Sequence, residues 1–308
     1  MEIEDEIYLI FLNLFCISEM LTKIGGISIG HTYCPKIMGI INISPESFYK
    51  KSIKLNSDEI QNAVLDMQCS GADLIDIGGM STAPYLETDI PIELEIERLQ
   101  YAVSIIRQIS DIPISIDTVR AGVLKSLLKY EINAINDVSG LKYDKKMSIV
   151  VSESKIPVIM GAYRIHSNFS NLSTGDICDT ISLLRESINI ANNSKIDNDK
   201  IIIDPSIGFF RKESNSPFFS KISDLDWYIR DVEILSNISL MKSLYKPVCI
   251  SVSRKSFMGP LLDLPVEERL VPSLITEIYC ILNGVSLIRT HNVKETCIAV
   301  NMIRALHQ

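Results

Sequence analysis

The feature that most constrains the fold of this chain is a series of eight short apolar runs, each ending abruptly in polar residues. Stretches of helical length separate the runs, and alternation of strand and helix is typical of a parallel sheet. The runs lie at residues 37–48, 72–84, 113–118, 132–140, 156–164, 201–210, 247–257 and 286–292. Eight strand–helix units predict an α/β fold, a (β/α)8 TIM barrel, with long loops after its first and second strands.

Residues 1–36 precede the first run and are predicted to be a short N-terminal extension packed on a barrel domain of residues 37–308. Within the extension, segment 7–17 is strongly apolar. Acidic residues precede this segment, whereas a signal peptide begins with positive charge, and the segment is too short to span a bilayer. We therefore expect it to cover the bottom of the barrel as a packed helix or strand.

The composition favours a protein that binds small molecules in a reducing compartment. Hydrophobic residues make up 46% of the chain, enough for a large core, and the net charge of −8 argues against nucleic acid or an anionic membrane surface as a partner. The seven cysteines show no CxxC spacing and lie mostly among apolar residues. We therefore expect free thiols rather than disulfides or a zinc site, and a cytoplasmic location.

Amide and acidic residues at four of the strand ends are candidates for ligand binding. They are Asn42, Asp117, Asn136 and Asp204. Each could instead cap the helix that follows its strand, because Asn and Asp are favoured N-caps. The carboxyl ends of barrel strands meet on one rim, however, so the four side chains are expected to converge. Two carboxylates and two amides suit a planar heterocycle that carries several hydrogen-bond donors and acceptors.

Two basic clusters follow the last two strands, at residues 253–256 (Ser-Arg-Lys-Ser) and 289–291 (Arg-Thr-His). Either cluster could be a solvated turn, but loops after the seventh and eighth strands of this fold often bind phosphate. Because side chains alternate along an extended segment, Arg289 and His291 are expected to point to the same side. The sequence thus predicts a phosphorylated or pyrophosphorylated heterocyclic substrate.

The residues and the order of these motifs closely resemble those of dihydropteroate synthase, a family that joins a dihydropterin to 4-aminobenzoate in folate synthesis. The resemblance covers about residues 37–300 and rests on NISPESF, DIGGMSTAP, SIDT, INDVSG, DPSIGF, SVSRKSF and RTHNVKET. It implies a transferase that condenses (7,8-dihydropterin-6-yl)methyl diphosphate with 4-aminobenzoate and releases diphosphate. It also implies Mg2+ as cofactor, and a homodimer formed through the last helices.

The resemblance further implies a role for each residue that matches a family motif. The residues implied to bind the pterin ring are Asp117, Asn136, Asp204 and Lys255. Those implied to hold the diphosphate are Asn42, which would also bind Mg2+, Arg289 and His291. Those implied to lie near the aminobenzoate are Thr82, Pro84, Phe209 and Ser253, with Phe48 in the first loop. The residues implied to take part in catalysis are Asp117, Asp204, Lys255, Arg289 and His291.

The chain departs from the family pattern on the side that would bind the second substrate. In the second loop the family carries Glu and Arg, where this chain has Met80 and Ala83. Since that Arg helps to hold the diphosphate in the family, another cation is expected to replace it. The candidates, chosen for their places in strand-end loops, are Lys50, Lys51 and Arg164.

These departures leave alternative functions open. One is an enzyme of the same type that uses a larger arylamine, the ribofuranosylaminobenzene phosphate of methanopterin synthesis, with room provided by Ala83, Gly161 and Ala162. Another is a pterin-dependent methyltransferase, which would not need the basic clusters. A third is a non-catalytic pterin-binding paralogue, which would have no reason to keep the residues of a leaving-group site. The retained basic residues therefore favour the folate enzyme.

Overall fold

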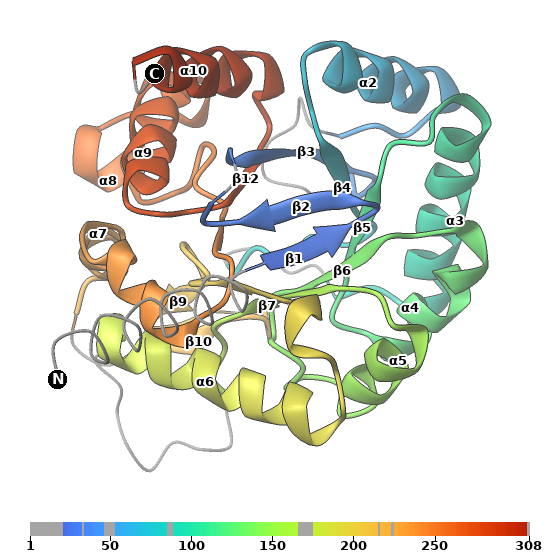
Figure 1. Ribbon diagram of the computed structural model, residues 1–308, viewed down its shortest axis with the longest axis horizontal. Helices are drawn as coiled ribbons and strands as arrows, with labels where there is room; N and C mark the ends of the chain where they lie inside the picture. Colours follow the sequence, from blue (N-terminus) through green and yellow to red (C-terminus); the bar gives the residue numbers. More distant parts are fainter. Residues whose placement is uncertain are drawn as a thin grey trace, which may run out of the picture.

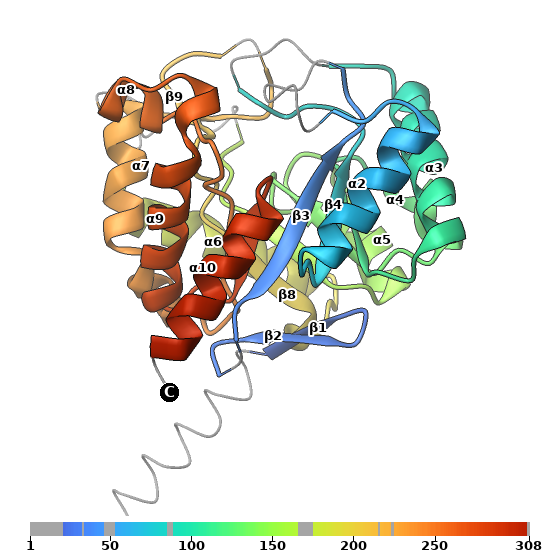
Figure 2. The same cartoon turned by 90° about the horizontal axis from the view of Figure 1, so that it is seen from above.

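The computed structural model describes residues 21–32, 34–45, 53–84, 89–165, 175–214, 216–222 and 225–306. Eight parallel strands form a barrel, and helices surround it (Figures 1 and 2). The strands follow one another in the order β11-β12-β3-β4-β5-β6-β7-β8. A parallel bridge between Ile203 and Val248 closes the ring, with the Ile203 N–H donating to Pro247 O at 3.0 Å. The predicted TIM barrel is confirmed.

Each of the eight predicted runs contains one barrel strand. The strands are β3 (Lys36–Asn42), β4 (Leu74–Gly78), β5 (Ile114–Asp117), β6 (Ala134–Asp137), β7 (Val158–Gly161), β8 (Ile201–Asp204), β11 (Cys249–Ile250) and β12 (Leu287–Thr290). The helices are α2 (Ser57–Cys69), α3 (Ile92–Ile109), α4 (Ala121–Leu127), α5 (Met147–Ser154), α6 (Ile177–Asn193), α7 (Trp227–Ser236), α8 (Met258–Leu262), α9 (Leu270–Leu282) and α10 (Val293–Leu306). In the described ranges, no helix has the length and hydropathy needed to cross a membrane.

The alternation of side chains along each strand decides which residues face the barrel interior. In β5, Ile114 and Ile116 lie in the apolar core between the sheet and the helices, so Asp117 points inward. The strand register then gathers polar residues into one layer. Across β3 to β6, consecutive Cα partners are Asn42, Gly78, Asp117 and Asn136. The predicted convergence of the strand-end residues follows from this register.

A β-hairpin covers the bottom of the barrel, where the strands begin (Figure 2). Its strands are β1 (Leu21–Ile24) and β2 (Ile27–Gly30). Ile24 and Ile29 are completely buried against the inward-facing residues at the starts of the barrel strands, and Thr22 Oγ1 donates to Ile201 O at 3.1 Å. Segment 7–17, for which the sequence predicted this position, lies outside the described residues; the hairpin that follows it provides the cover.

Helix α9 exists where predicted but buries a different face. The helical spacing of Leu270, Leu274, Ile278 and Ile281 predicts an apolar stripe on the buried face, but these residues are only partly buried. The buried residues are Ser273, Glu277 and Cys280. The physical reason is polar contact with neighbouring segments: Ser273 Oγ accepts from Arg254 N at 2.8 Å, and Glu277 Oε2 accepts from Thr296 Oγ1 at 2.8 Å. Such partners cannot be recognised from hydrophobic periodicity.

Candidate functional site

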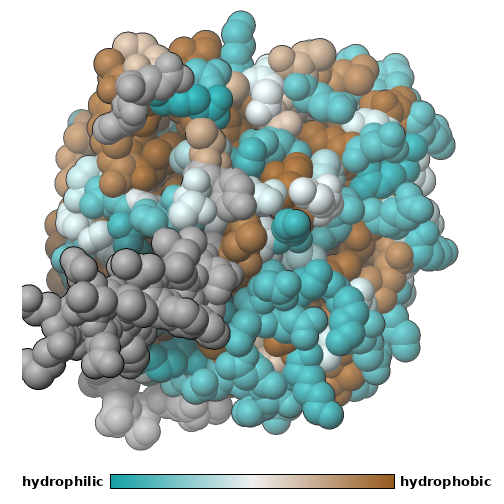
Figure 3. Space-filling model, viewed as in Figure 1, coloured by the Kyte–Doolittle hydropathy of each residue, from teal (hydrophilic) through white to brown (hydrophobic). Residues whose placement is uncertain are grey.

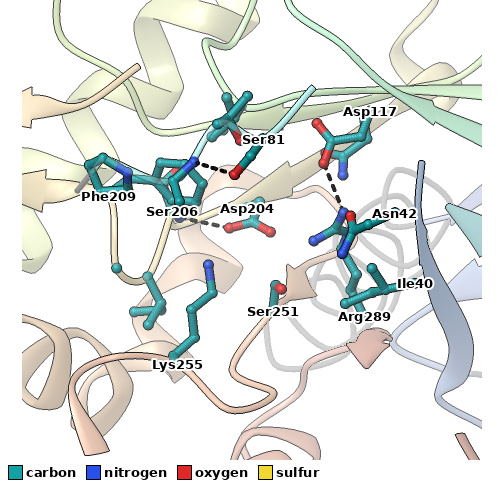
Figure 4. A pocket seen from close by; sticks show the side chains of 18 of the residues that line it. Ile40, Asn42, Ser81, Asp117, Asp204, Ser206, Phe209, Ser251, Lys255 and Arg289 are labelled. Carbon is teal, nitrogen blue, oxygen red and sulfur yellow. Dashed lines mark hydrogen bonds and ion pairs between the residues drawn. The ribbon is translucent and has the colours of Figure 1, made fainter. Parts of the chain in front are cut away.

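A pocket lies at the carboxyl ends of the barrel strands, and all but one of the predicted site residues that the structure describes line it (Figure 4). Those that line it are Asn42, Thr82, Pro84, Asp117, Asn136, Asp204, Phe209, Lys255, Arg289 and His291. Figure 4 shows Lys255, Ser206 and Phe209 on one side of Asp204, and Asn42, Asp117 and Arg289 on the other. The exception, Ser253, is 1% exposed and is not among the lining residues.

A charged cluster forms the wall on the Arg289 side. Arg289 Nε donates to Asp76 Oδ2 at 2.6 Å, and its Nη2 donates to Asp117 Oδ2 at 2.8 Å. Asn136 Nδ2 donates to the same Asp76 oxygen at 2.9 Å. Two carboxylates from neighbouring strands therefore fix the orientation of the guanidinium before any ligand arrives.

Asp76 is a site residue that the sequence reasoning missed. It lies in the middle of β4 and is completely buried. The signal was available: a charged residue between Ile75 and Ile77, inside a run of apolar residues, is expensive to bury without a partner. Asp76 lies within a strand rather than at its end, so the strand-end pattern does not identify it. Its contact with Arg289 spans most of the chain.

Burial changes the acidity of the pocket carboxyls. It raises the pKa of Asp117 to about 7; the Arg289 charge opposes this shift, and the nearby Asp76 carboxylate adds to it. Burial likewise raises the pKa of Asp204, although Ser206 N donates to Asp204 Oδ1 at 2.7 Å and Lys255 lies close by. Asp117 is thus well placed to exchange a proton with a ligand near neutral pH, and the Asp204 carboxyl lies beside it in the same pocket.

The basic residues respond to the same burial. The pKa of Lys255 falls to about 8, because the amine is buried and Arg289 lies nearby, and its Nζ lies 4.6 Å from the centre of the Phe209 ring. Burial and the neighbouring cations lower the pKa of His291 well below its usual range. His291 N donates to Ser253 Oγ at 3.1 Å, and its ring Nδ1 is also 3.1 Å from that hydroxyl. Ser253 therefore orients a neutral imidazole instead of lining the pocket.

The loop after β4 is held from two sides. Arg98 Nη1, from α3, donates to Gly79 O at 3.0 Å, and Ser214 Oγ donates to Pro84 O. Met80 packs with Val119 and Phe218 in a small apolar cluster. Met80, which stands where the family has Glu, thus contributes apolar packing that anchors this wall of the pocket.

The predicted substitute for the missing loop-two Arg is not Arg164. Its side chain pairs with Asp179 at the start of α6 and does not line the pocket. The cationic residues among those lining the pocket, in the part of the chain that the structure describes, are Lys255 and Arg289. The other candidates, Lys50 and Lys51, and the predicted loop residue Phe48 lie outside the described residues.

Arg254 of the first basic cluster has a structural role. Its Nε donates to Asn292 Oδ1 at 3.0 Å, and its Nη1 donates to the backbone carbonyls of Val266 and Glu267. It is 6% exposed and ties the loop after β11 to the start of α10. Of this basic cluster, Lys255 and Ser256 line the pocket.

The residues after the fifth barrel strand do not enlarge the pocket. Ala162 is completely buried in the core between the sheet and the helices. Gly161 lines the pocket, but a Cβ there would lie 2.2 Å from Val138 O, so close backbone approach requires glycine. Of the three positions proposed to make room for a larger arylamine, only Ala83 faces the pocket as a shortened side chain.

A metal ion in this pocket would need ligands from the substrate. In the described ranges, no three His, Cys, Asp or Glu side chains gather as metal ligands do. Asn42 Oδ1 and Asp117 Oδ2 both lie within 4 Å of the point where a Cβ on Gly78 would stand, at 3.5 and 3.9 Å. An amide oxygen beside a carboxylate suits Mg2+, which is commonly held by one or two protein oxygens together with substrate phosphates.

Known proteins share both the sequence pattern and the fold. The model of the pterin binding enzyme family matches residues 38–291. The dihydropteroate synthase of Clostridium beijerinckii is 34% identical over 86% of this chain and 92% of its own length, and that of Bacillus subtilis is 32% identical over 88% of each. Among solved structures, dihydropteroate synthase from Clostridium difficile in the presence of pteroic acid is 31% identical, with a TM-score of 0.75 over 89% of this chain and 97% of that one.

A second solved structure, of the Coxiella burnetii dihydropteroate synthase in complex with pteroic acid, is 28% identical, with a TM-score of 0.78 over 94% of this chain and 99% of that one. The matching segment contains the barrel strands, except for the first two residues of β3, and the pocket residues described above. This chain therefore belongs to the pterin binding enzyme family.

Proposed function

We propose that this protein is a dihydropteroate synthase, a transferase that condenses (7,8-dihydropterin-6-yl)methyl diphosphate with 4-aminobenzoate to give 7,8-dihydropteroate and diphosphate in folate biosynthesis. One observation carries the proposal: a single pocket joins a ring of carboxylates and amides to two cationic side chains. Relatives at 34% and 32% identity are dihydropteroate synthases, which supports the same assignment.

The carboxylates and amides would bind the pterin ring. A pterin presents several ring and exocyclic donors and acceptors in one plane, and Asp117, Asn136 and Asp204 can meet them from different strands. As the C–O bond to diphosphate weakens, positive charge develops on the ring. Asp204 lies at the centre of the pocket, where an ionised carboxylate would stabilise that charge (Figure 4).

The cationic residues would receive the leaving group. The diphosphate departs with the bonding electron pair, the arylamine nitrogen forms the new C–N bond to the methylene carbon, and the amine releases a proton. Arg289 donates from Nε to Asp76 and from Nη2 to Asp117. Its other guanidinium N–H groups could donate to the diphosphate. Because its carboxylate partners fix its position in advance, little reorganisation is needed during the reaction.

We propose Mg2+ as the cofactor, with Asn42 Oδ1 as a protein ligand and diphosphate oxygens as further ligands. When bound, Mg2+ would neutralise charge on the diphosphate. Asn42 supplies an oxygen in the pocket beside the Asp117 carboxylate. Asn42→Ala should weaken the Mg2+-dependent part of diphosphate binding, measured by calorimetry with and without EDTA. Equal Mg2+ dependence in the variant and the original protein would contradict this role.

We also propose 4-aminobenzoate, rather than a larger arylamine, as the second substrate. Thr82, Pro84 and Phe209 line the part of the pocket that the loops after β4 and β8 form. Gly161 and Ala162 provide no extra space there. A dihydropteroate synthase from Xanthomonas albilineans, with a TM-score of 0.77 and 25% identity, has been solved with 4-aminobenzoic acid.

We further propose a cytoplasmic homodimer. The cysteines in the described residues are unpaired, which suits a reducing compartment. Helices α9 and α10 expose apolar side chains to solvent, among them Val271, Ile275, Ile298 and Met302. Figure 3 shows apolar residues gathered over these helices, at the upper left. A patch of this kind is typical of a protein–protein interface.

The test is diphosphate release by the purified protein, given the dihydropterin diphosphate, Mg2+ and either 4-aminobenzoate or the ribofuranosyl phosphate arylamine. We expect release and dihydropteroate formation with 4-aminobenzoate. Asp204→Asn should lower kcat/KM at least about 100-fold, since it removes the negative charge that would stabilise the positive charge developing on the ring. Asp226→Asn, at a side chain that is 59% exposed, is the matched control. Pterin binding without turnover of either amine would contradict the proposal.

A further inference from the structure

A short segment after β8 lies at the pocket end of the barrel. It spans residues 210–222, described except at position 215, and contains β9 (Phe210–Arg211) and β10 (Ser220–Lys221). The two strands pair in parallel, and Ile222 N donates to Arg211 O at 3.0 Å. Figure 2 shows β9 at the end of the barrel opposite the β1–β2 hairpin. We call residues 210–222 the β9–β10 segment.

The β9–β10 segment contacts the loop after β4 at two points. Phe218 is 1% exposed and packs with Met80 in an apolar cluster. Ser214 Oγ donates to Pro84 O. Met80 and Pro84 line the pocket, and Thr82 lies between them in the sequence. The described lining residues include neither Phe218 nor Ser214. The segment therefore supports one wall of the pocket without belonging to that wall.

The loop after β7 holds the β9–β10 segment in place. Tyr163 donates from its hydroxyl to Pro217 O at 3.0 Å. Arg164 N donates to Ser220 Oγ at 2.9 Å, and Ser220 is completely buried. Because these two bonds lie on either side of Phe218 in the sequence, they fix the backbone that carries its ring.

The start of the segment contacts a second wall of the pocket. Arg211 Nη2 donates to Ser256 Oγ at 2.8 Å, and Ser256, which follows β11, lines the pocket. Arg211 is 6% exposed, and its guanidinium carbon lies 3.7 Å from the centre of the Trp227 ring on α7. The β9–β10 segment thus connects the loop after β4 with the loop after β11.

We propose that the β9–β10 segment sets the affinity for the arylamine, with Phe218 and Ser214 as positioning residues. This inference rests on the proposed function, in which the loop after β4 forms part of the arylamine site. The strand ladder of the barrel holds Asp117, Asn136 and Asp204, whereas a loop depends on its neighbours. Loss of the support should therefore weaken arylamine binding and leave pterin binding unchanged.

The test is calorimetric titration of Phe218→Ala and Ser214→Ala with 6-hydroxymethylpterin, and with 4-aminobenzoate in the presence of that pterin, Mg2+ and diphosphate. Phe218→Ala removes the packing on Met80, so the Kd for 4-aminobenzoate should rise roughly tenfold as the loop shifts. Ser214→Ala keeps the apolar cluster and removes one hydrogen bond, so this Kd should rise about threefold. Phe218→Leu keeps an apolar contact and should restore most of the affinity. The Kd for the pterin should stay within about twofold in all three variants.

The matched control is Leu127→Ala, at a completely buried position of α4 that is not among the lining residues. Its Tm should fall as that of Phe218→Ala does, because both changes leave a cavity, but neither Kd should change. An unchanged Kd for 4-aminobenzoate in both Phe218→Ala and Ser214→Ala would overturn the inference. So would an equal rise for the two ligands, or a failure of the original protein to bind 4-aminobenzoate.

The synthase assay on the original protein tests the proposed function separately. If that protein makes no dihydropteroate but its affinity for 4-aminobenzoate depends on Phe218, the proposed function fails and the role of the β9–β10 segment stands. If it makes dihydropteroate and both alanine variants bind 4-aminobenzoate as well as it does, only the role of the segment fails.

Discussion

At the scale of single residues, Asp117 should make the ligand-free protein less stable as the pH rises. Its pKa is about 7 in the folded protein, against an ordinary value of 3.8. Between these values the unfolded chain releases the proton that the folded protein retains, so the stabilising contribution is complete below about pH 4 and is lost as the pH rises through 7. Asp117→Asn stays neutral throughout and lacks this loss.

The measurement is the Tm of the original protein and of Asp117→Asn between pH 4 and 8. We expect the Tm of the variant minus that of the original protein to increase with pH across this window, while contributions from other groups cancel. Asp66→Asn, at an exposed position of α2, is the control and should show a constant difference. Parallel Tm curves for Asp117→Asn and the original protein would contradict the prediction.

Lys255 should set the alkaline limit of activity. Its pKa of about 8 means that the amine loses its charge as the pH rises through 8, and binding to an anionic substrate weakens with it. We expect kcat/KM for the pterin diphosphate to fall about tenfold per pH unit above that point. Lys255→Arg keeps a charged side chain, so its profile should lack this fall even if its activity is lower. A flat profile for the original protein up to pH 9.5 would refute the assignment.

Residues at strand ends could be predicted from the sequence, because an apolar run followed by a polar residue marks the rim of a barrel. Asn42, Asp117 and Asp204 were found in this way. The distant partners of buried charged residues could not be predicted. Arg164 forms an ion pair with Asp179, and Asp76 forms one with Arg289, near the other end of the chain. Neighbouring residues in the sequence carry no sign of either pairing.

At the scale of elements, α7 supports the loop after β8 through a completely buried ion pair. Arg230 Nη1 lies 3.1 Å from Asp231 Oδ1, and the same oxygen accepts from Gly208 N at 3.1 Å. Arg230 also donates to Gly175 O at 2.8 Å and to Thr180 Oγ1 at 2.8 Å. One guanidinium thus joins α6, α7 and the loop that carries Ser206 and Phe209 into the pocket.

Arg230→Met should therefore destabilise the protein strongly, by about 3–5 kcal/mol, because it leaves the Asp231 carboxylate buried without its partner. Lys212→Met is the matched control: it breaks the pair with Asp226, whose side chains are 49% and 59% exposed. That change should cost less than about 1 kcal/mol. Urea unfolding measures both. Similar losses in the two variants would show that burial does not distinguish the pairs.

The elements themselves were predictable to different degrees. Each barrel strand is a β-branched run with helical sequence on either side, so all eight were identified before their pairing was known. The hairpin that covers the bottom was not predicted, because residues 21–30 show little periodicity. The prediction of a cover concerned segment 7–17, which lies outside the described residues. What selects the hairpin is the contact of Ile24 and Ile29 with the barrel floor.

At the scale of the whole molecule, the exposed apolar side chains are not evenly spread. Val271 and Ile275 on α9 are each 63% exposed, and on α10 Ile298 is 62% and Met302 57% exposed. These helices are neighbours in the barrel's outer ring (Figures 1 and 2). Burying such a surface against a second copy would remove it from water, which is the main driving force for association.

A double variant, Ile275→Glu with Ile298→Glu, should therefore convert the proposed dimer to a monomer, because it places charges at the centre of the interface where no partner could neutralise them. Light scattering after size exclusion should give the original protein about 69 kDa, twice the chain mass of 34.5 kDa, and the variant the mass of one chain. Tyr101→Glu changes a 45% exposed aromatic residue on α3, across the barrel, and should leave the dimer intact. None of the described residues that line the pocket lies on α9 or α10, so the monomeric variant should still bind the pterin. A single-chain mass for the original protein at micromolar concentration would rule out the dimer.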